Sequence, residues 1–224
     1  MPTPQADGKT QTNARESIPK PRIQTLSDMI FGLALSIGAV SALIKNPGSV
    51  QDIYYSLVSF GFFFIIIALV WLRYSKIMSV LPFENTKVVA ANMALLFLVS
   101  VEPYLYNLMN ISAYTPSPGQ LNSGTTTALY AIDMGALLFI LAYFTYELTV
   151  EEKHLIPREL AREYRLSMDA CLIVAAIFIF SALPIFWGIV IIRAPTVPLR
   201  YFMWCGVSVV NAGRRLDVRR VKVN

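Results

Sequence analysis

The stretch Arg22–Val40, RIQTLSDMIFGLALSIGAV, joins a polar entrance to an uncharged apolar segment. A helix turns by about 100° per residue, so four aliphatic side chains form a single stripe: Leu33, Ile37, Val40 and Ile44. The last of them lies just beyond the quoted stretch. Gly32 and Gly38 are small enough to let another helix approach closely. Because lipid is as apolar as leucine, periodicity alone does not tell whether the stripe faces lipid or protein. The stretch therefore predicts a membrane helix whose orientation stays open.

The polar entrance has a local explanation of its own. Thr25-Leu26-Ser27-Asp28 fits a capping box, in which a hydroxyl and an acid three residues later bind free backbone N–H groups. Arg22 can extend its guanidinium to anionic lipid headgroups. Local chemistry alone therefore assigns no function to these residues.

The composition is that of an integral membrane protein. The 224 residues are 55% hydrophobic and only 15% charged, whereas soluble domains carry about 25% charged residues. A helix needs roughly 20 mostly apolar residues to cross the hydrocarbon core. We therefore predict an all-α fold with six transmembrane helices, over about 26–44, 53–72, 88–109, 127–146, 167–192 and 201–213. The last segment is too short to span the bilayer on its own.

Three acidic residues, Asp28, Glu102 and Asp133, must be included if the first, third and fourth segments are to span the bilayer. Each lies near a predicted segment end, where water or a helix N-terminus can stabilise a carboxylate. Glu102 precedes Pro103, which predicts that the helix breaks there, at the outer edge of the membrane. Asp133 is the least explained of the three.

The basic residues predict the topology. If the amino terminus is cytoplasmic and six segments cross, 16 of the 19 Lys and Arg residues lie on the cytoplasmic side, in agreement with the positive-inside rule. We therefore expect both termini in the cytoplasm, with residues 1–21 as a disordered tail and residues 214–224 as a basic tail. The net charge of +5 reflects this topology and gives no reason to expect a nucleic-acid partner.

The residue types that enzymes and metal sites need are missing or scattered. The single histidine, His154, lies in a charged loop, and Cys171 and Cys205 lie in apolar segments without CxxC spacing. The sequence contains no HExxH, no GxSxG and no glycine-rich phosphate loop. We therefore expect no catalytic activity, no metal site and no cofactor.

Arg22, Ser27 and Asp28 stand at the spacing of a known first-helix signature, in which Arg is followed after three residues by Phe-Ser-Asp. Downstream, Trp71 ends the second segment and Asn92 lies in the third, which ends with Pro103-Tyr104. In these features the sequence resembles the transmembrane protein 175 family, the potassium channels of lysosomes and many prokaryotes. The motif support covers roughly residues 22–109.

The resemblance implies a single six-helix channel domain, residues 22–213, that assembles as a homotetramer with the first helices lining a central pore. Such a channel passes potassium ions across a lipid bilayer, here expected to be the plasma membrane. Carried over by position, the pore-lining and gating residues are Leu33, Ser36, Ile37 and Val40, with Ser36 at the place of the family's pore-adjacent threonine. Rings of aliphatic side chains can block ions by dewetting.

The resemblance also gives the polar entrance a role. Arg22, Ser27 and Asp28 would tie the first helix to Trp71 and Asn92 on the second and third helices, without touching the ion. Polar groups left unpaired in lipid are costly, so such a cluster can fix the orientation of a pore helix.

The sequence departs from the family pattern at several positions. Leu26 replaces phenylalanine, Gly32 and Leu33 replace Ala-Ile, and Ser36, Ile37 and Gly38 replace Thr-Leu-Leu. Tyr74 replaces a histidine. The exchange at Tyr74 removes a titratable partner. Two alternatives remain open at this point. One is a proton-leak channel or secondary transporter on the same fold, with Asp133 or Glu102 carrying charge. The other is a non-conducting membrane protein that binds lipid or a partner.

Overall fold

The computed structural model describes residues 20–43, 49–82, 85–114, 123–150, 158–186, 190–193, 196–198 and 203–204. Five long helices make up most of this part: α1 (Lys20–Leu43), α2 (Val50–Met78), α3 (Thr86–Tyr114), α4 (Ser123–Thr149) and α5 (Arg158–Ser181). Each is long and apolar enough to cross a membrane. The prediction of long apolar helices is therefore confirmed for five segments, the fifth with other bounds.

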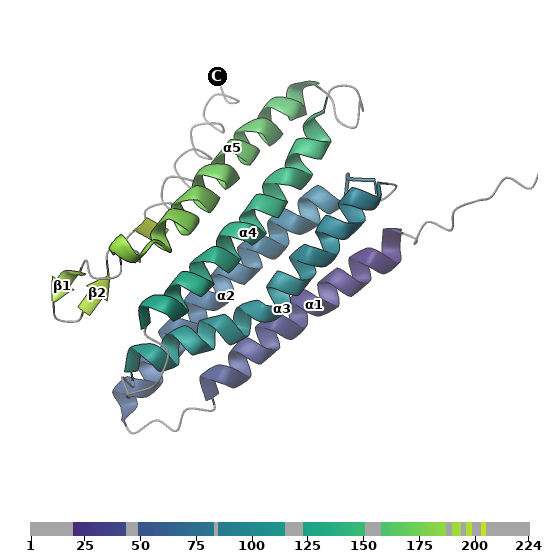
Figure 1. Ribbon diagram of the computed structural model, residues 1–224. Helices are drawn as coiled ribbons and strands as arrows, with labels where there is room; N and C mark the ends of the chain where they lie inside the picture. The colour runs from purple at the N-terminus through teal and green to yellow at the C-terminus, as the bar shows by residue number, and fades with distance from the viewer. Residues whose placement is uncertain are drawn as a thin grey trace, which may run out of the picture.

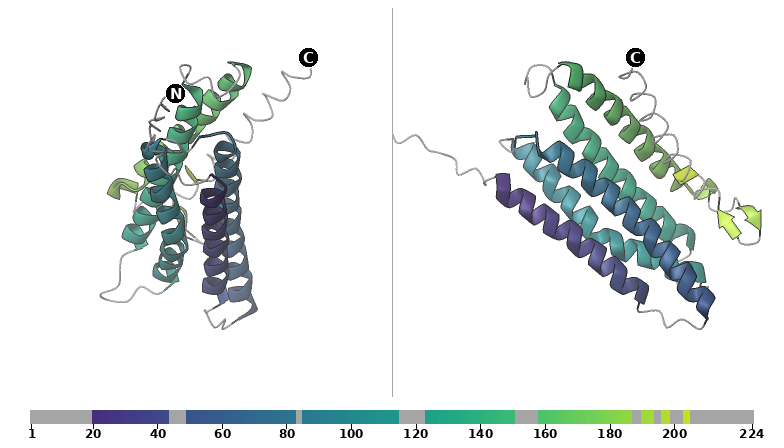
Figure 2. Two further views of the ribbon diagram at one scale, coloured as in Figure 1. Left: turned by 90° about the vertical axis from the view of Figure 1, so that its right-hand side faces the viewer. Right: turned by 180° about the vertical axis from the view of Figure 1, so that it is seen from behind.

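The helices run alternately up and down in a bundle (Figures 1 and 2). α1 packs on α2 and α3, α3 packs on α4, and α4 packs on α5. As a result α1 and α5 lie at opposite edges of the bundle (Figure 1). We call the end at which α1, α3 and α5 begin the proximal end, and the other end the distal end.

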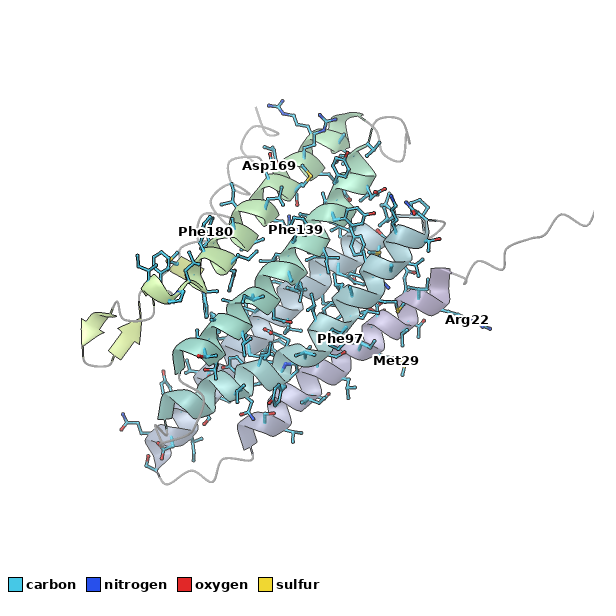
Figure 3. The ribbon with its side chains drawn as sticks, viewed as in Figure 1. Arg22, Met29, Phe97, Phe139, Asp169 and Phe180 are labelled. Carbon is cyan, nitrogen blue, oxygen red and sulfur yellow. The ribbon has the colours of Figure 1, made fainter. Side chains whose placement is uncertain are left out.

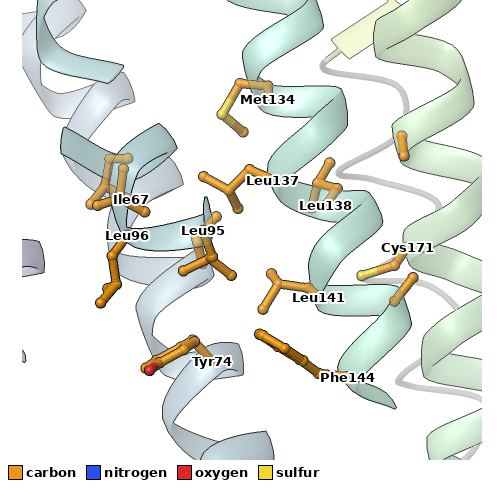
Figure 4. Packing of buried hydrophobic residues seen from close by; sticks show 14 of the residues in the cluster. Ile67, Tyr74, Leu95, Leu96, Met134, Leu137, Leu138, Leu141, Phe144 and Cys171 are labelled. Atoms are coloured by element: carbon orange, nitrogen blue, oxygen red, sulfur yellow. The ribbon is translucent and has the colours of Figure 1, made fainter. Parts of the chain in front are cut away.

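Large apolar side chains from α2, α3 and α4 fill the centre of the bundle. In the close-up they interdigitate between the helices (Figure 4), and α5 adds the buried Cys171. The best-buried members include Ile67, Tyr74, Leu95, Leu137, Leu141 and Phe144. α4 is the most enclosed helix of the five, because α3 covers one side and α5 the other.

The capping box predicted at Thr25–Asp28 is wrong, because α1 begins earlier, at Lys20. Thr25 and Asp28 therefore lie inside the helix, where the backbone N–H groups already have helical partners. The Ser27 hydroxyl accordingly donates to a backbone carbonyl, that of Ile23 at 2.8 Å, instead of accepting from a free N–H.

The fifth predicted segment, 167–192, is wrong at both ends. α5 begins at Arg158 and ends at Ser181, and a single 3₁₀ turn, Pro184–Phe186, follows. The backbone tightens before this proline: Leu183 donates to the Phe180 carbonyl at 3.1 Å. Proline lacks an N–H and disfavours a helical residue before it, so the α-helix stops although the sequence stays apolar.

The chain beyond α5 contains two short strands that the sequence analysis did not predict. β1 (Val190–Arg193) and β2 (Thr196–Pro198) pair antiparallel, and they lie beyond the distal end of α5 (Figure 1). The predicted sixth helix, 201–213, lies outside the described residues except for Met203 and Trp204. Trp204 is buried against the bundle.

The predicted helix break at Glu102-Pro103 is also wrong. α3 continues through Pro103 to Tyr114, and Glu102 is fully buried. Asp133 likewise lies inside α4 and not at its end. A proline removes one backbone hydrogen bond from a helix, but neighbouring helices can hold the helix together in a membrane protein, and α3 packs on both α1 and α4.

Two glycines allow close contacts between helices. A Cβ at Gly38 of α1 would lie 2.9 Å from Cδ1 of Phe63 on α2 and closer still to Cε1. A Cβ at Gly135 of α4 would lie 2.6 Å from Ile179 on α5. By contrast, nothing lies within 4 Å of a Cβ added to Gly32. Gly38 thus allows the close approach that the sequence predicted, whereas Gly32 has no such role in the single chain.

We therefore expect Gly38→Ala to lower the thermal unfolding midpoint of the purified protein, because Phe63 is fully buried and must shift to make room. Overpacking of this kind costs about 1–3 kcal/mol. Gly32→Ala is the matched control on the same helix, and its midpoint should not fall, since alanine is the better helix former. Equal losses in the two variants would contradict the packing described for α1.

Candidate pore face and its polar anchor

One face of α1 lacks cover from the rest of the chain. Leu33, Ile37 and Val40 are 59%, 43% and 55% exposed, and Ser36 between them is exposed as well. Met29 continues the same face toward the proximal end and projects away from the other helices (Figure 3). The predicted stripe is therefore a continuous apolar surface of the single chain, apart from Ile44, which lies outside the described residues.

The opposite face of α1 is packed. Ile23, Phe31 and Ala34 are buried in the core, and Gly38 contacts Phe63 as described above. α1 thus presents this face to the other helices and leaves the stripe of Leu33, Ile37 and Val40 outside.

Ser36 keeps its hydroxyl close to its own helix. Its Oγ donates to the carbonyl of Gly32 at 2.9 Å. The oxygen lone pairs then remain on the exposed side of the helix, where they can accept a hydrogen bond or contact a cation.

A buried polar chain links α1, α2 and α3 near the proximal end. The hydroxyl groups of Ser27 and Tyr74 are 2.6 Å apart, and Tyr74 donates to Oδ1 of Asn92 at 2.7 Å. All three side chains are buried, so these hydrogen bonds form away from water, where breaking them leaves unpaired polar atoms.

A second contact lies at the surface, one residue further along α1. Nε1 of Trp71 donates to Oδ1 of Asp28 at 2.9 Å. Near the same end, Nε2 of Gln24 donates to the carbonyl of Met78 at 3.3 Å. The structure thus brings four of the predicted anchoring residues into contact with neighbouring helices: Ser27, Asp28, Trp71 and Asn92.

Arg22 is not part of this cluster in the single chain. Its side chain is exposed and projects from the first turn of α1, away from the bundle (Figure 3). The chain's own packing therefore leaves Arg22 accessible to solvent, to lipid headgroups or to another copy of the chain.

Tyr74 contributes more to the contacts of α1 than its departure from the family signature indicates. It replaces the histidine of the family signature, and its hydroxyl bridges Ser27 to Asn92. Its ring also contacts that of Phe31 on α1, with centroids 5.5 Å apart. The sequence contained an indication of this contact: Tyr74 lies three residues after Trp71, and residues three apart on a helix share one side.

Among the described residues, no group of three or more His, Cys, Asp or Glu side chains could hold a metal ion. The exposed face of α1 is uncharged between Met29 and Val40. If an ion passes along this face, it therefore meets aliphatic side chains and one hydroxyl rather than a charged binding site.

Residues 22–103 match the model of the family described as the endosomal/lysosomal potassium channel TMEM175. This range contains the apolar face of α1, the polar chain and most of α3. Over residues 22–103, the chain is thus similar to the TMEM175 family. No curated protein sequence matches the chain significantly.

Two solved TMEM175 structures share the fold. The lysosomal potassium-selective channel TMEM175 homolog from Chamaesiphon minutus is 19% identical, with a TM-score of 0.52 over 73% of this chain and 88% of that one. A variant of the potassium channel MtTMEM175, solved in complex with a nanobody fusion protein, is 16% identical, with a TM-score of 0.55 over 90% of this chain and 95% of that one. Together with the five apolar helices, the TMEM175 match identifies a multi-pass membrane protein.

We expect Tyr74→Phe to destabilise the purified protein by about 1–2 kcal/mol, because it leaves the buried Oδ1 of Asn92 without a donor and removes the contact with the Ser27 hydroxyl. The control is Tyr146→Phe, since Tyr146 is 54% exposed on α4. The thermal unfolding midpoint of each variant is measured, with size-exclusion chromatography to detect the folded protein that remains after heating. If Tyr74→Phe is as stable as Tyr146→Phe, the polar chain does not hold α1 in place.

Proposed function

We propose that this chain forms a homotetrameric, potassium-permeable channel whose pore is lined by α1. The observation that carries the proposal is the uncovered face of α1: Leu33, Ile37 and Val40 are exposed in the single chain and lie inside the segment that matches the family. Both structural neighbours are named potassium channels. In a ring of four chains these side chains would face the axis.

The chemistry of the α1 face suits a gate made by dewetting. Rings of Leu33, Ile37 and Val40 would form a narrow apolar constriction that expels water and so blocks ions. A small outward movement or rotation of α1 would widen the constriction and let water enter. No charged side chain would have to move for the pore to open.

Ser36 would supply the polar atom of the constriction. Because its proton is donated to the Gly32 carbonyl, its oxygen would present lone pairs toward a passing cation. Serine provides this oxygen without the methyl group of the family's threonine, so the pore would be slightly wider at this level.

The polar chain supports the proposal because it controls the rotation of α1. Ser27 and Asp28 bind α2 near the proximal end, and Gly38 packs on Phe63 further along the helix. With the helix held at these two levels, the aliphatic stripe would keep its direction toward the axis. Arg22 would stay free to meet lipid headgroups or a neighbouring subunit.

We further propose that the proximal end faces the cytoplasm and that the host membrane is the plasma membrane. Arg73, Lys76 and Lys87 lie at this end, in the last turns of α2 and the first turn of α3. Their position fits the positive-inside rule. Both tails, residues 1–21 and 214–224, would then be cytoplasmic.

The test compares Ile37→Cys with Ile173→Cys in a background that lacks Cys171 and Cys205. Ile37 and Ile173 are similarly exposed in the single chain, 43% and 47%. Thiol reagents react with the thiolate, which needs water, so a cysteine in a pore should react whereas one facing lipid should not. We expect the reagent to reduce potassium flux into proteoliposomes at least several-fold for Ile37→Cys and to leave Ile173→Cys unchanged.

Three results would contradict the proposal. Flux that is unaffected by modification of position 37 would remove α1 from the pore. Flux that saturates at low turnover and disappears in Asp133→Asn would instead support the secondary transporter considered from the sequence. A protein that carries no current under any gradient would support a non-conducting role.

A further inference from the structure

Two carboxyl groups lie together inside the bundle, on α3 and α4. Glu102 is 0% exposed and Asp133 is 6% exposed. They are close enough to interact with each other, and the fully buried hydroxyl of Tyr130 lies beside Glu102. These three groups are separate from the exposed face of α1, and neither the proposed pore nor the polar anchor uses them.

No described residue donates a well-formed hydrogen bond to this pair. Both carboxylate oxygens of Glu102, Oδ2 of Asp133 and the hydroxyl of Tyr130 are buried without a hydrogen-bond partner in the part of the chain that the structure describes. Buried polar atoms are normally paired. Four such atoms at one place therefore indicate that a ligand absent from the polypeptide completes the site.

The surroundings of the pair contain no cation among the described residues. The ionisable groups that bear on it are Tyr130 and, next to Tyr130, Tyr106. Gly135, two residues along α4, faces Ala175 and Ile179 of α5. The charged side chains described on the other helices lie elsewhere along them: Arg22 and Asp28 on α1, Asp52, Arg73 and Lys76 on α2, and Arg162, Glu163, Arg165 and Asp169 on α5.

Trp204 closes the distal side of this region. Its ring lies 5.5 Å from that of Tyr130 and stacks on Phe178 at 5.1 Å. Its Nε1 donates to Oγ of Ser181 at 3.0 Å. Trp204 thus places its indole beside the tyrosine that adjoins Glu102.

Two carboxylates this close, without a cation, cannot both be ionised inside a membrane protein. Each buried charge costs several kcal/mol unless it is paired, and like charges at one site raise that cost further. One proton removes one of the charges. It also supplies the donor that both groups lack, because a protonated carboxyl group donates to a carboxylate.

We propose that Glu102 and Asp133 form a proton-binding site in the interior of the subunit, in which one proton is held between the two carboxyl groups. The hydroxyl of Tyr130, which lies beside Glu102, would donate to the carboxylate that remains once the pair holds its proton, and would so position the pair. The proton comes from solvent and returns to it, and no metal ion or other co-reactant is required.

Infrared spectroscopy tests the site directly, through the carbonyl stretch of a protonated carboxylic acid. The protein is purified in a detergent without ester groups, because ester carbonyls absorb in the same region. We expect wild-type protein at neutral pH to show this band, to shift it in D₂O and to lose it at alkaline pH. The double variant Glu102→Gln/Asp133→Asn should lack the band. Asp169→Asn, which changes an exposed acid on α5, should keep it.

The absence of the band from wild-type protein at neutral pH would overturn the proposal, and so would its persistence in the double variant. The wild-type spectrum decides the matter even if the double variant does not fold. Tyr130→Phe provides a further check: the band should remain, because the two carboxyl groups still share the proton, and its frequency should change, because the carboxylate loses a donor.

The pH dependence of stability gives a second measurement. The folded state binds a proton that exposed carboxyl groups in the unfolded state release above about pH 4–5. The folded state therefore binds more protons, and stability falls as the pH rises. We expect the unfolding midpoint of wild-type protein to fall as the pH rises above about pH 5, and that of the double variant to change clearly less. Equal slopes for the two proteins would contradict the proposal.

Discussion

The hydroxyl group of Tyr74 is the contact on which the arrangement of α1 depends. It joins Ser27 to Asn92 and so connects three helices through buried hydrogen bonds. Burial of apolar surface cannot fix the rotation of a helix in lipid, because lipid and protein are equally apolar. A few directional polar contacts can, since a rotated helix would leave their atoms unpaired. The exposed direction of Leu33, Ile37 and Val40 follows from this constraint.

Polar groups inside the bundle fall into two classes with different consequences. In the proximal half, Ser27, Tyr74 and Asn92 largely satisfy one another, although Nδ2 of Asn92 remains without a partner among the described residues. Toward the distal half, Glu102, Tyr130 and Asp133 leave four buried polar atoms without a hydrogen bond from the described chain. The first class connects three helices, and the second forms the proposed proton-binding pair.

Much of the fold could be predicted from local sequence. The apolar runs located the first four helices, although each begins earlier than predicted, because hydropathy marks the apolar centre of a helix and not its polar ends. The family signature located the contacts of Ser27, Asp28, Trp71 and Asn92. Tyr74 was noted only as a departure from the family, yet a tyrosine hydroxyl can donate and accept where a histidine would.

Other features depend on tertiary packing and could not be predicted from local sequence. Pro103 and Pro184 look alike in the sequence, but α3 continues through the first because α1 and α4 support it on two sides, whereas α5 ends before the second. The same support buries Glu102, which local reasoning placed at the membrane edge. The burial of Trp204 likewise depends on the return of the chain to the bundle after α5.

In the proposed channel, other copies of the same chain cover the exposed face of α1. Native mass spectrometry of the detergent-solubilised protein tests this association between copies most directly. We expect an assembly with the mass of four 25.0 kDa chains, which dissociates when Ile37 is replaced by a charged residue. A wild-type protein with the mass of a single chain would contradict the proposed channel, because α1 would then have no pore to line.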